Sequence, residues 1–178
     1  MAAVLAACVA GVSGAVGASA GARAAGNAAQ RQAEYDHDLQ VRQAAVRDIE
    51  TVCGAYHEKG MAALLSVYDF QTAICGGGDG AGEEAVFVQS FRILMMATFD
   101  VGRCSFVLEE PAARWYEAIQ RIANTLRALR ADLTAAADPG SPGRQQLVAV
   151  WTEHRAAFHA FSTRVHEAKK QAAARSEG

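Results

Sequence analysis

Proline and aromatic residues are scarce in this sequence of 178 residues, and both absences narrow the fold. It contains three prolines, the first of them Pro111, and Phe, Trp and Tyr together make up 7% of the chain. The scarcity of proline excludes a proline-rich scaffold and leaves a long stretch with nothing to interrupt a helix. Alanine is abundant instead, with 40 residues. Because alanine is the strongest helix former and a poor strand former, the composition predicts an all-α protein.

An excess of charge of either sign is also missing. The chain has 17 Lys and Arg against 19 Asp and Glu, a formal net charge of -2, and 51% of its residues are apolar. Proteins that bind nucleic acid need a basic surface to neutralise phosphates, so we expect no nucleic-acid partner. The same balance excludes an acidic disordered tail. The length suits one domain of ordinary size, with or without an appendage.

Charged side chains are absent from residues 1–22, MAAVLAACVAGVSGAVGASAGA. This run is about as long as a helix that spans a bilayer core. Four basic residues follow it, at Arg23, Arg31, Arg42 and Arg47. Since cationic flanks stay in the cytoplasm, the run predicts a transmembrane anchor in the cell membrane, with the N-terminus outside and the rest of the chain cytoplasmic. Two alternatives stay open: a signal peptide with Ala18-Ser19-Ala20 as its cleavage site, and a buried helix of a soluble protein.

Glycines recur at helical spacing within this first segment. Gly14, Gly17 and Gly21 lie on one side of the expected helix. Small residues allow membrane helices to approach closely, so these glycines predict a helix-association face for a second copy or another protein. The alternative is composition alone, because a segment rich in Ala and Gly produces such spacings by chance.

An apolar seam repeats every seven residues along the next part of the chain. One row is Leu39, Val46, Cys53, Gly60, Val67 and Ile74, and the complementary row is Arg42, Ile49, Tyr56, Ala63 and Phe70. A heptad seam of this length predicts a coiled coil or one helix of an antiparallel bundle. We expect a bend or a helix junction around Gly54 and Gly60.

Three more amphipathic stretches favour the bundle of about four helices. The glycine-rich residues 75–82 predict a loop, residues 83–103 predict a helix, and Pro111 is typical of the first residue of another. A firm break at 138–143 precedes a last helix over about 144–174. The expected division is a membrane anchor over 1–22, a long juxtamembrane helix with the first part of the bundle over 23–138, and a C-terminal bundle helix with a frayed tail over 139–178.

Aromatic residues of the last three helices are candidates for the core or for a ligand pocket. They are Phe87, Phe91, Trp115, Trp151 and Phe158. Both tryptophans start apolar rows, so we expect both to be largely buried. His154 lies on the apolar stripe of the last helix and is expected to be a hydrogen-bonded core histidine rather than a metal ligand.

Motifs that would carry chemistry are missing. Glu34 and His37 have the spacing of a helical di-iron motif, but no second Glu-x-x-His occurs. The loop over 75–82 lacks the Lys-Ser/Thr of a phosphate loop and is followed by Glu83 and Glu84. The four cysteines lack metal-site spacing, and no nucleophile and base share a recognisable context. We therefore predict no enzyme activity, no metal and no cofactor.

The order of these features resembles a broad group of uncharacterised actinobacterial proteins. It comprises an Ala/Gly run, an Arg/Gln/Glu-rich helix directly after it, and Arg92, Arg103 and Glu109-Glu110-Pro111 leading into a helix. The resemblance covers most of the chain, and 14 Arg against 3 Lys suits a GC-rich genome. It implies one N-terminal membrane helix and a small helical cytosolic domain, and it implies no activity.

Two functions remain in view at this point. The first is a non-enzymatic, single-pass membrane-anchored helical protein that self-associates or docks a partner at the cytoplasmic face. The alternative is a helical protein that binds a ligand or effector in an aromatic-lined pocket, soluble or secreted if the first segment is not an anchor. The expected partners are the lipid bilayer and either a second copy or another protein.

Overall fold

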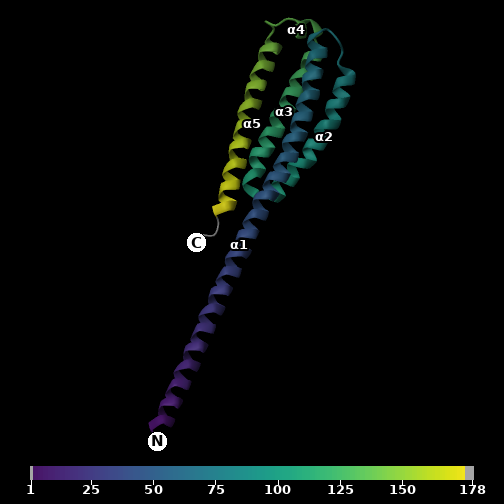
Figure 1. Ribbon diagram of the computed structural model, residues 1–178. Helices are drawn as coiled ribbons and strands as arrows, with labels where there is room; N and C mark the ends of the chain where they lie inside the picture. The colour runs from purple at the N-terminus through teal and green to yellow at the C-terminus, as the bar shows by residue number, and fades with distance from the viewer. Residues whose placement is uncertain (1, 175–178) are drawn as a thin grey trace. The chain divides into compact units, whose positions relative to one another are not determined.

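Five helices make up the protein in a computed structural model, which describes the backbone of residues 2–174 and the side chains of residues 25–174. They are α1 (Ala2–Cys75), α2 (Ala81–Cys104), α3 (Phe106–Arg130), α4 (Leu133–Ala137) and α5 (Pro142–Ala174) (Figure 1). Residues 2–174 contain no strand, which confirms the all-α prediction. The chain divides into two compact units, Met1–Ala44 and Ala45–Gly178. The boundaries expected at 22 and 138 stay predictions.

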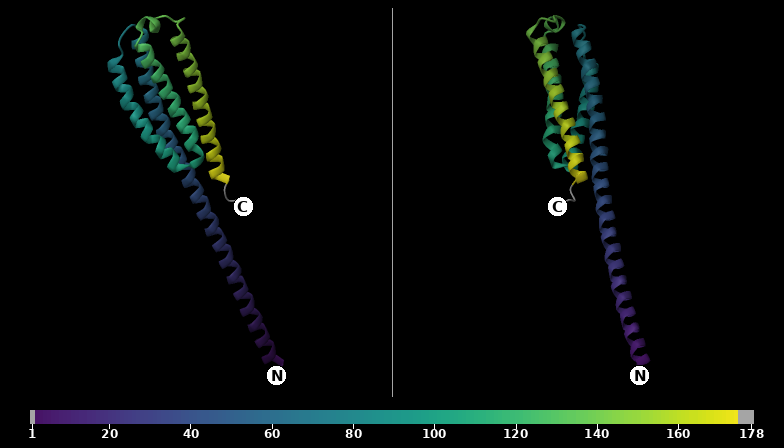
Figure 2. Two further views of the ribbon diagram at one scale, coloured as in Figure 1. Left: turned by 180° about the vertical axis from the view of Figure 1, so that it is seen from behind. Right: turned by 60° about the vertical axis from the view of Figure 1, so that its left-hand side comes forward.

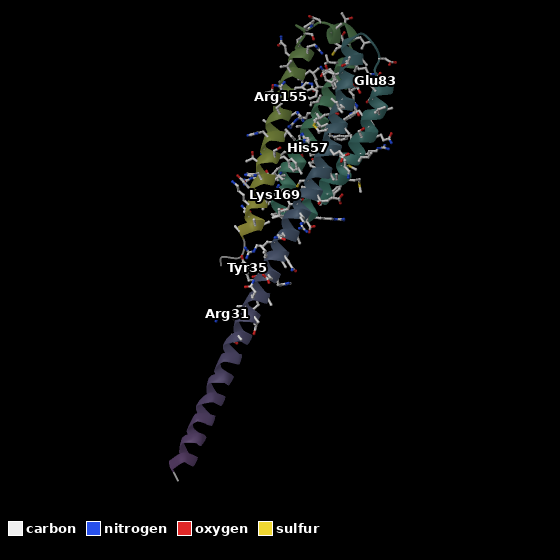
Figure 3. The ribbon with its side chains drawn as sticks, viewed as in Figure 1. Arg31, Tyr35, His57, Glu83, Arg155 and Lys169 are labelled. Atoms are coloured by element: carbon white, nitrogen blue, oxygen red, sulfur yellow. The ribbon has the colours of Figure 1, made fainter. Side chains whose placement is uncertain are left out.

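The first unit is a single stretch of α1. Its side chains from residue 25 to residue 41 are all exposed, as the sticks of Arg31 and Tyr35 illustrate (Figure 3). Local pairs support the helix, since Gln30 Nε2 donates to Glu34 Oε1 at 2.9 Å and Gln32 Nε2 donates to Asp36 Oδ1 at 2.9 Å, each one turn further along. Pairs at this spacing contribute a few tenths of a kcal/mol each, so this stretch depends mainly on its helix-forming composition.

The second unit, which we call the bundle, consists of α1 from Ala45 onward, α2, α3 and α5 packed side by side (Figures 1 and 2). Successive long helices run in opposite directions, and the short α4 lies at one end (Figure 1). One core joins all four long helices. Its largest fully buried side chains include Tyr56, Phe70, Phe87, Trp115 and Leu126.

The heptad seam predicted along α1 is confirmed within the bundle. Every seam residue from Ile49 to Ile74 is buried, because the seven-residue spacing keeps one side of the helix turned toward its neighbours. The seam does not extend to its predicted start. Leu39 is exposed and Arg42 is partly buried, and both belong to the first unit.

Gly60 is the one seam residue without a side chain, and the structure gives a reason. Helix α1 is continuous through Gly54 and Gly60, so the expected helix junction there is wrong. A Cβ atom on Gly60 would lie 2.9 Å from Cζ2 of Trp115 and still closer to Cη2. The indole of α3 therefore packs directly on the backbone of α1, which needs a residue with no side chain at this point. Gly54 has open space around it.

A short loop connects α1 to α2, and a glycine with positive φ shapes it. Gly80 adopts a positive φ of 62° before α2 and lies on the Phe70 ring, where a Cβ atom would come within 2.8 Å of Cδ2. The predicted loop at 75–82 is thus confirmed in shortened form, over 76–80. Glu84, in the first turn of α2, holds the far end of α3 through an ion pair of 2.6 Å to Arg127 and a second one to Arg130.

Helix α3 begins earlier than its sequence predicts. Ser105 alone, in an extended conformation with φ -156° and ψ 114°, separates α2 from α3. Pro111 was expected as the first helical residue but lies inside α3, which begins at Phe106. Its ring replaces the N–H that would donate to the carbonyl of Val107. At the other break, Pro142 is the first residue of α5, which agrees with the preference of proline for that position.

Candidate functional site

Trp115 lies at the centre of the aromatic core. Its side chain is 0% exposed. The ring meets Tyr56 edge-on with centroids 5.2 Å apart and also packs against Phe158 at 5.0 Å and Phe161 at 5.5 Å. Its Nε1–H donates to Nε2 of His154 at 2.9 Å. Residues from α1 and α5 therefore converge on the indole of α3, and the prediction that Trp115 is buried is confirmed.

His154 is the polar partner of this core, as its place on the apolar stripe predicted. Because Nε2 accepts the bond from Trp115, the neutral ring carries its proton on Nδ1. Nδ1 is buried and has no hydrogen-bond partner among the described residues. Burial lowers the pKa of His154, and the nearby Arg155 lowers it further. The arrangement favours a neutral, structural histidine.

Acidification is expected to destabilise the bundle through His154. The pKa of this group is lower in the folded chain than in the unfolded chain, where it lies near 6.5. The unfolded state therefore binds more protons, and the free energy of unfolding decreases as the pH falls below about 6.5. His154→Gln, whose side-chain oxygen can still accept from Trp115, should lose less stability than the unsubstituted chain between pH 7.5 and 5.5 in urea titrations. Equal losses would contradict this role.

The other candidate aromatics are packed to different degrees. Phe87 is buried, and Phe91 stacks on Tyr116 with ring centroids 4.4 Å apart. Trp151 is partly buried, not fully, and donates to Oε1 of Gln71 at 2.7 Å. His57 lies on the α1 side of this region (Figure 3), with its ring 5.4 Å from that of Phe158. None of the five candidate aromatics lines the groove described next.

A groove of about 1030 Å³ opens elsewhere, at the end of the bundle near the α2–α3 connection. We call it the junction groove. Its walls come from α1, the end of α2, the start of α3 and α5, and they include the small residues Ala45, Ala55, Ala97, Ala168 and Ala172. Large side chains fill the same interior further along the bundle. Alanines from three helices therefore leave space that larger side chains would fill.

Charged groups of both signs border the junction groove. Asp48, Lys59, Asp100 and Arg103 all line it, and none of them forms an ion pair with another described residue. Cys53 lies buried close by, and burial raises the pKa of its thiol to about 11, which disfavours the reactive thiolate. No group of three or more His, Cys, Asp or Glu that could hold a metal ion occurs in the part of the chain that the structure describes.

Helix α2 has apolar residues on both sides. Its inner side buries Phe87, Leu94, Ala97 and Val101. Its exposed side carries large apolar residues that we call the α2 outer face, namely Val86, Ile93, Met95, Met96 and Phe99. Within the described residues, α2 is the one helix long and apolar enough, by length and composition, to cross a membrane, and 22% of its most apolar stretch is buried.

Sequence reasoning predicted an amphipathic helix over 83–103 and missed its second apolar side. The signal was present in the run Ile93-Leu94-Met95-Met96, since four consecutive apolar residues cannot all point inward from one helix. Phe106, at the start of α3, is 85% exposed and adds a further apolar side chain at the end of α2. The glycines predicted as a helix-association face, Gly14, Gly17 and Gly21, lie outside the residues whose side chains the structure describes.

Comparisons of this chain with protein-family models, with curated proteins and with solved structures find no match.

Proposed function

We propose that this chain is a non-enzymatic helical protein, anchored in the cell membrane by residues 1–22, whose bundle docks a protein partner at the cytoplasmic face. The observation that carries the docking role is the α2 outer face. Folded domains seldom leave several large apolar residues exposed along one helix, and such patches mark surfaces of association. Ile93, Met96 and Phe99 are 49%, 62% and 61% exposed, although the same helix buries its opposite side.

Support for the anchor and its orientation comes from the sequence. Residues 1–22 carry no charge, and Arg23 follows at once. A charge in the middle of such a segment would cost about 2.5–3.5 kcal/mol on insertion scales, so the absence matters. The arginines from Arg23 to Arg47 favour a cytoplasmic bundle by the positive-inside rule. Within the membrane, Gly14, Gly17 and Gly21 provide a second place for helices to associate.

Membrane retention tests the anchor directly. Replacing both Val9 and Val12 by Arg should move the chain from the carbonate-washed membrane pellet into the soluble fraction, because two charges in the apolar segment oppose insertion. The matched control is Val41→Arg, at an exposed position of α1 outside this segment, which should stay in the pellet. If the unsubstituted chain is already released by carbonate, the anchor is rejected.

The junction groove favours a second candidate function, a helical protein that binds a ligand. Its volume of about 1030 Å³ reaches the upper end of the range of small-molecule sites, and its apolar walls with charges at the border suit an apolar molecule with a polar head. Binding of an apolar fluorescent probe should be lost on Ala55→Phe, at an exposed position of α1 that lines the groove, and kept on Ala85→Phe, at an exposed position of α2 outside it. Equal binding by both variants would reject the groove as the site.

A further inference from the structure

Three of the five residues of the α2 outer face, Ile93, Met96 and Phe99, are arranged symmetrically about Met96. Ile93 and Phe99, three residues before and after it, are both large, apolar and exposed. Arg92 and Asp100, four residues before and after it, are both exposed and have opposite charges. The order along the helix is therefore cation, apolar, Met96, apolar, anion. Such a pattern is complementary to itself when it is read in the reverse direction.

The two charges have no partner within the described part of the chain. Neither Arg92 nor Asp100 forms an ion pair or a side-chain hydrogen bond there. Helix α2 is also placed where a partner can reach it. It packs on α3, and it meets α1 at the Ser66–Ser90 hydroxyl contact of 3.2 Å, whereas its outer face covers no other helix.

A two-fold axis perpendicular to α2 would place the helix of a second copy antiparallel to the first. With the axis at Met96, residues at equal distances on opposite sides of Met96 come to the same level. Arg92 of each copy then faces Asp100 of the other, and Ile93 faces Phe99, so every interaction occurs twice, as in any isologous contact. A parallel arrangement in register would instead bring Arg92 to Arg92 and Asp100 to Asp100, and like charges oppose association.

We propose that the α2 outer face binds a second copy of this chain, antiparallel, with Met96 at the two-fold axis. The proposal deepens the docking role proposed above for the α2 outer face, and it rests on that role and not on the anchor. A lipid surface fits the face less well, because Arg92 and Asp100 would have to leave water for the bilayer without a partner of opposite charge. A second copy pairs both charges.

Association through α2 differs from association through the N-terminal glycines. In the antiparallel dimer the Ala45 ends of the two bundles lie at opposite ends of the assembly, because the two-fold axis reverses the helix direction. Helices that pair through Gly14, Gly17 and Gly21 in one membrane run in the same direction. The charge exchange described next therefore distinguishes the two arrangements, because Arg92 meets Asp100 of another copy only when the helices are antiparallel.

A charge exchange in the full-length chain in detergent tests the proposal. Arg92→Asp or Asp100→Arg alone turns two attractions into two repulsions and should raise the dimer dissociation constant by about tenfold or more. The double variant R92D/D100R restores both pairs with their signs exchanged and should return the constant to within about threefold of the original. Circular dichroism must show unchanged helix content in all three variants. We expect this because both substituted positions are exposed.

A disulfide at the axis provides the second measurement. Met96→Cys should form a covalent dimer under mild oxidation, since the two positions meet at the axis, whereas Val148→Cys, at an exposed position of α5, should not. Any of three results would overturn the dimer. The chain could be monomeric at all concentrations, the double variant could associate as weakly as the single variants, or cross-linking could be equal at positions 96 and 148. Vesicle binding lost on Met96→Asp, without dimers, would overturn it in favour of lipid contact. Carbonate retention with no dimer would reject this inference and leave the anchor standing.

Discussion

Trp115→Ala is expected to lower the free energy of unfolding of the bundle by roughly 3–5 kcal/mol, the range for a fully buried large aromatic residue. The substitution leaves a cavity among Tyr56, Phe158 and Phe161, whose rings all contact the indole. It also leaves Nε2 of His154 without its donor, and an unsatisfied buried acceptor adds to the cost. Urea denaturation followed by circular dichroism gives the difference.

The matched control is Trp151→Ala. Trp151 is of equal size but only partly buried, so its loss should cost clearly less. Equal losses at the two tryptophans would contradict the central role of Trp115. A loss of under about 1 kcal/mol at Trp115 would mean that the neighbouring side chains collapse into the space. We do not expect this, because packed cores relax only partly around a cavity.

Gly60→Ala is expected to destabilise the bundle by about 1–3 kcal/mol, although alanine is the better helix former. The added Cβ atom would overlap the Trp115 indole, and Tyr56, Phe158 and Phe161 pack around that ring and restrain it. Gly54→Ala, on the same helix with nothing within 4 Å, should instead stabilise by about 0.5–1 kcal/mol. The two alanine variants differ in sign because only one of the two sites faces the indole.

Combining the substitutions sharpens this test. In a Trp115→Ala background the obstacle at Gly60 is gone, so Gly60→Ala should become neutral or stabilising. The coupling between the two sites, measured by a double-mutant cycle, should then be comparable to the cost of Gly60→Ala alone. A cost at Gly60 that is unchanged in the absence of the indole would show that the glycine serves some purpose other than close packing.

Features that depend on local periodicity could be predicted from the sequence. The seam from Ile49 to Ile74, the break after Cys75 and the buried state of Trp115 and His154 all follow from the spacing of apolar residues and of glycines. This works because a helix places every third or fourth residue on one side, whatever it packs against.

Features that depend on several helices at once could not be predicted. Gly60 was interpreted as a junction because its partner, Trp115, lies on another helix, and no pattern within α1 shows it. The junction groove is lined by alanines on α1, α2 and α5, and each alanine alone is merely a good helix former. The start of α3 was misplaced because Pro111 lies in the second turn of the helix, where it costs the hydrogen bond to the carbonyl of Val107, and not in the first turn that proline prefers.

The single residue between α2 and α3 has a consequence for the order in which the chain folds. The entropy lost on closing a loop grows with its length, and the Ser105 connection is about as short as a helical hairpin allows. Contacts between α2 and α3 are therefore the least costly tertiary contacts to form, whereas α5 must also order α4 before it docks. We expect this hairpin to be the folding nucleus, so that substitutions at Leu94 or Leu108 slow folding, while those at Leu147 mainly speed unfolding.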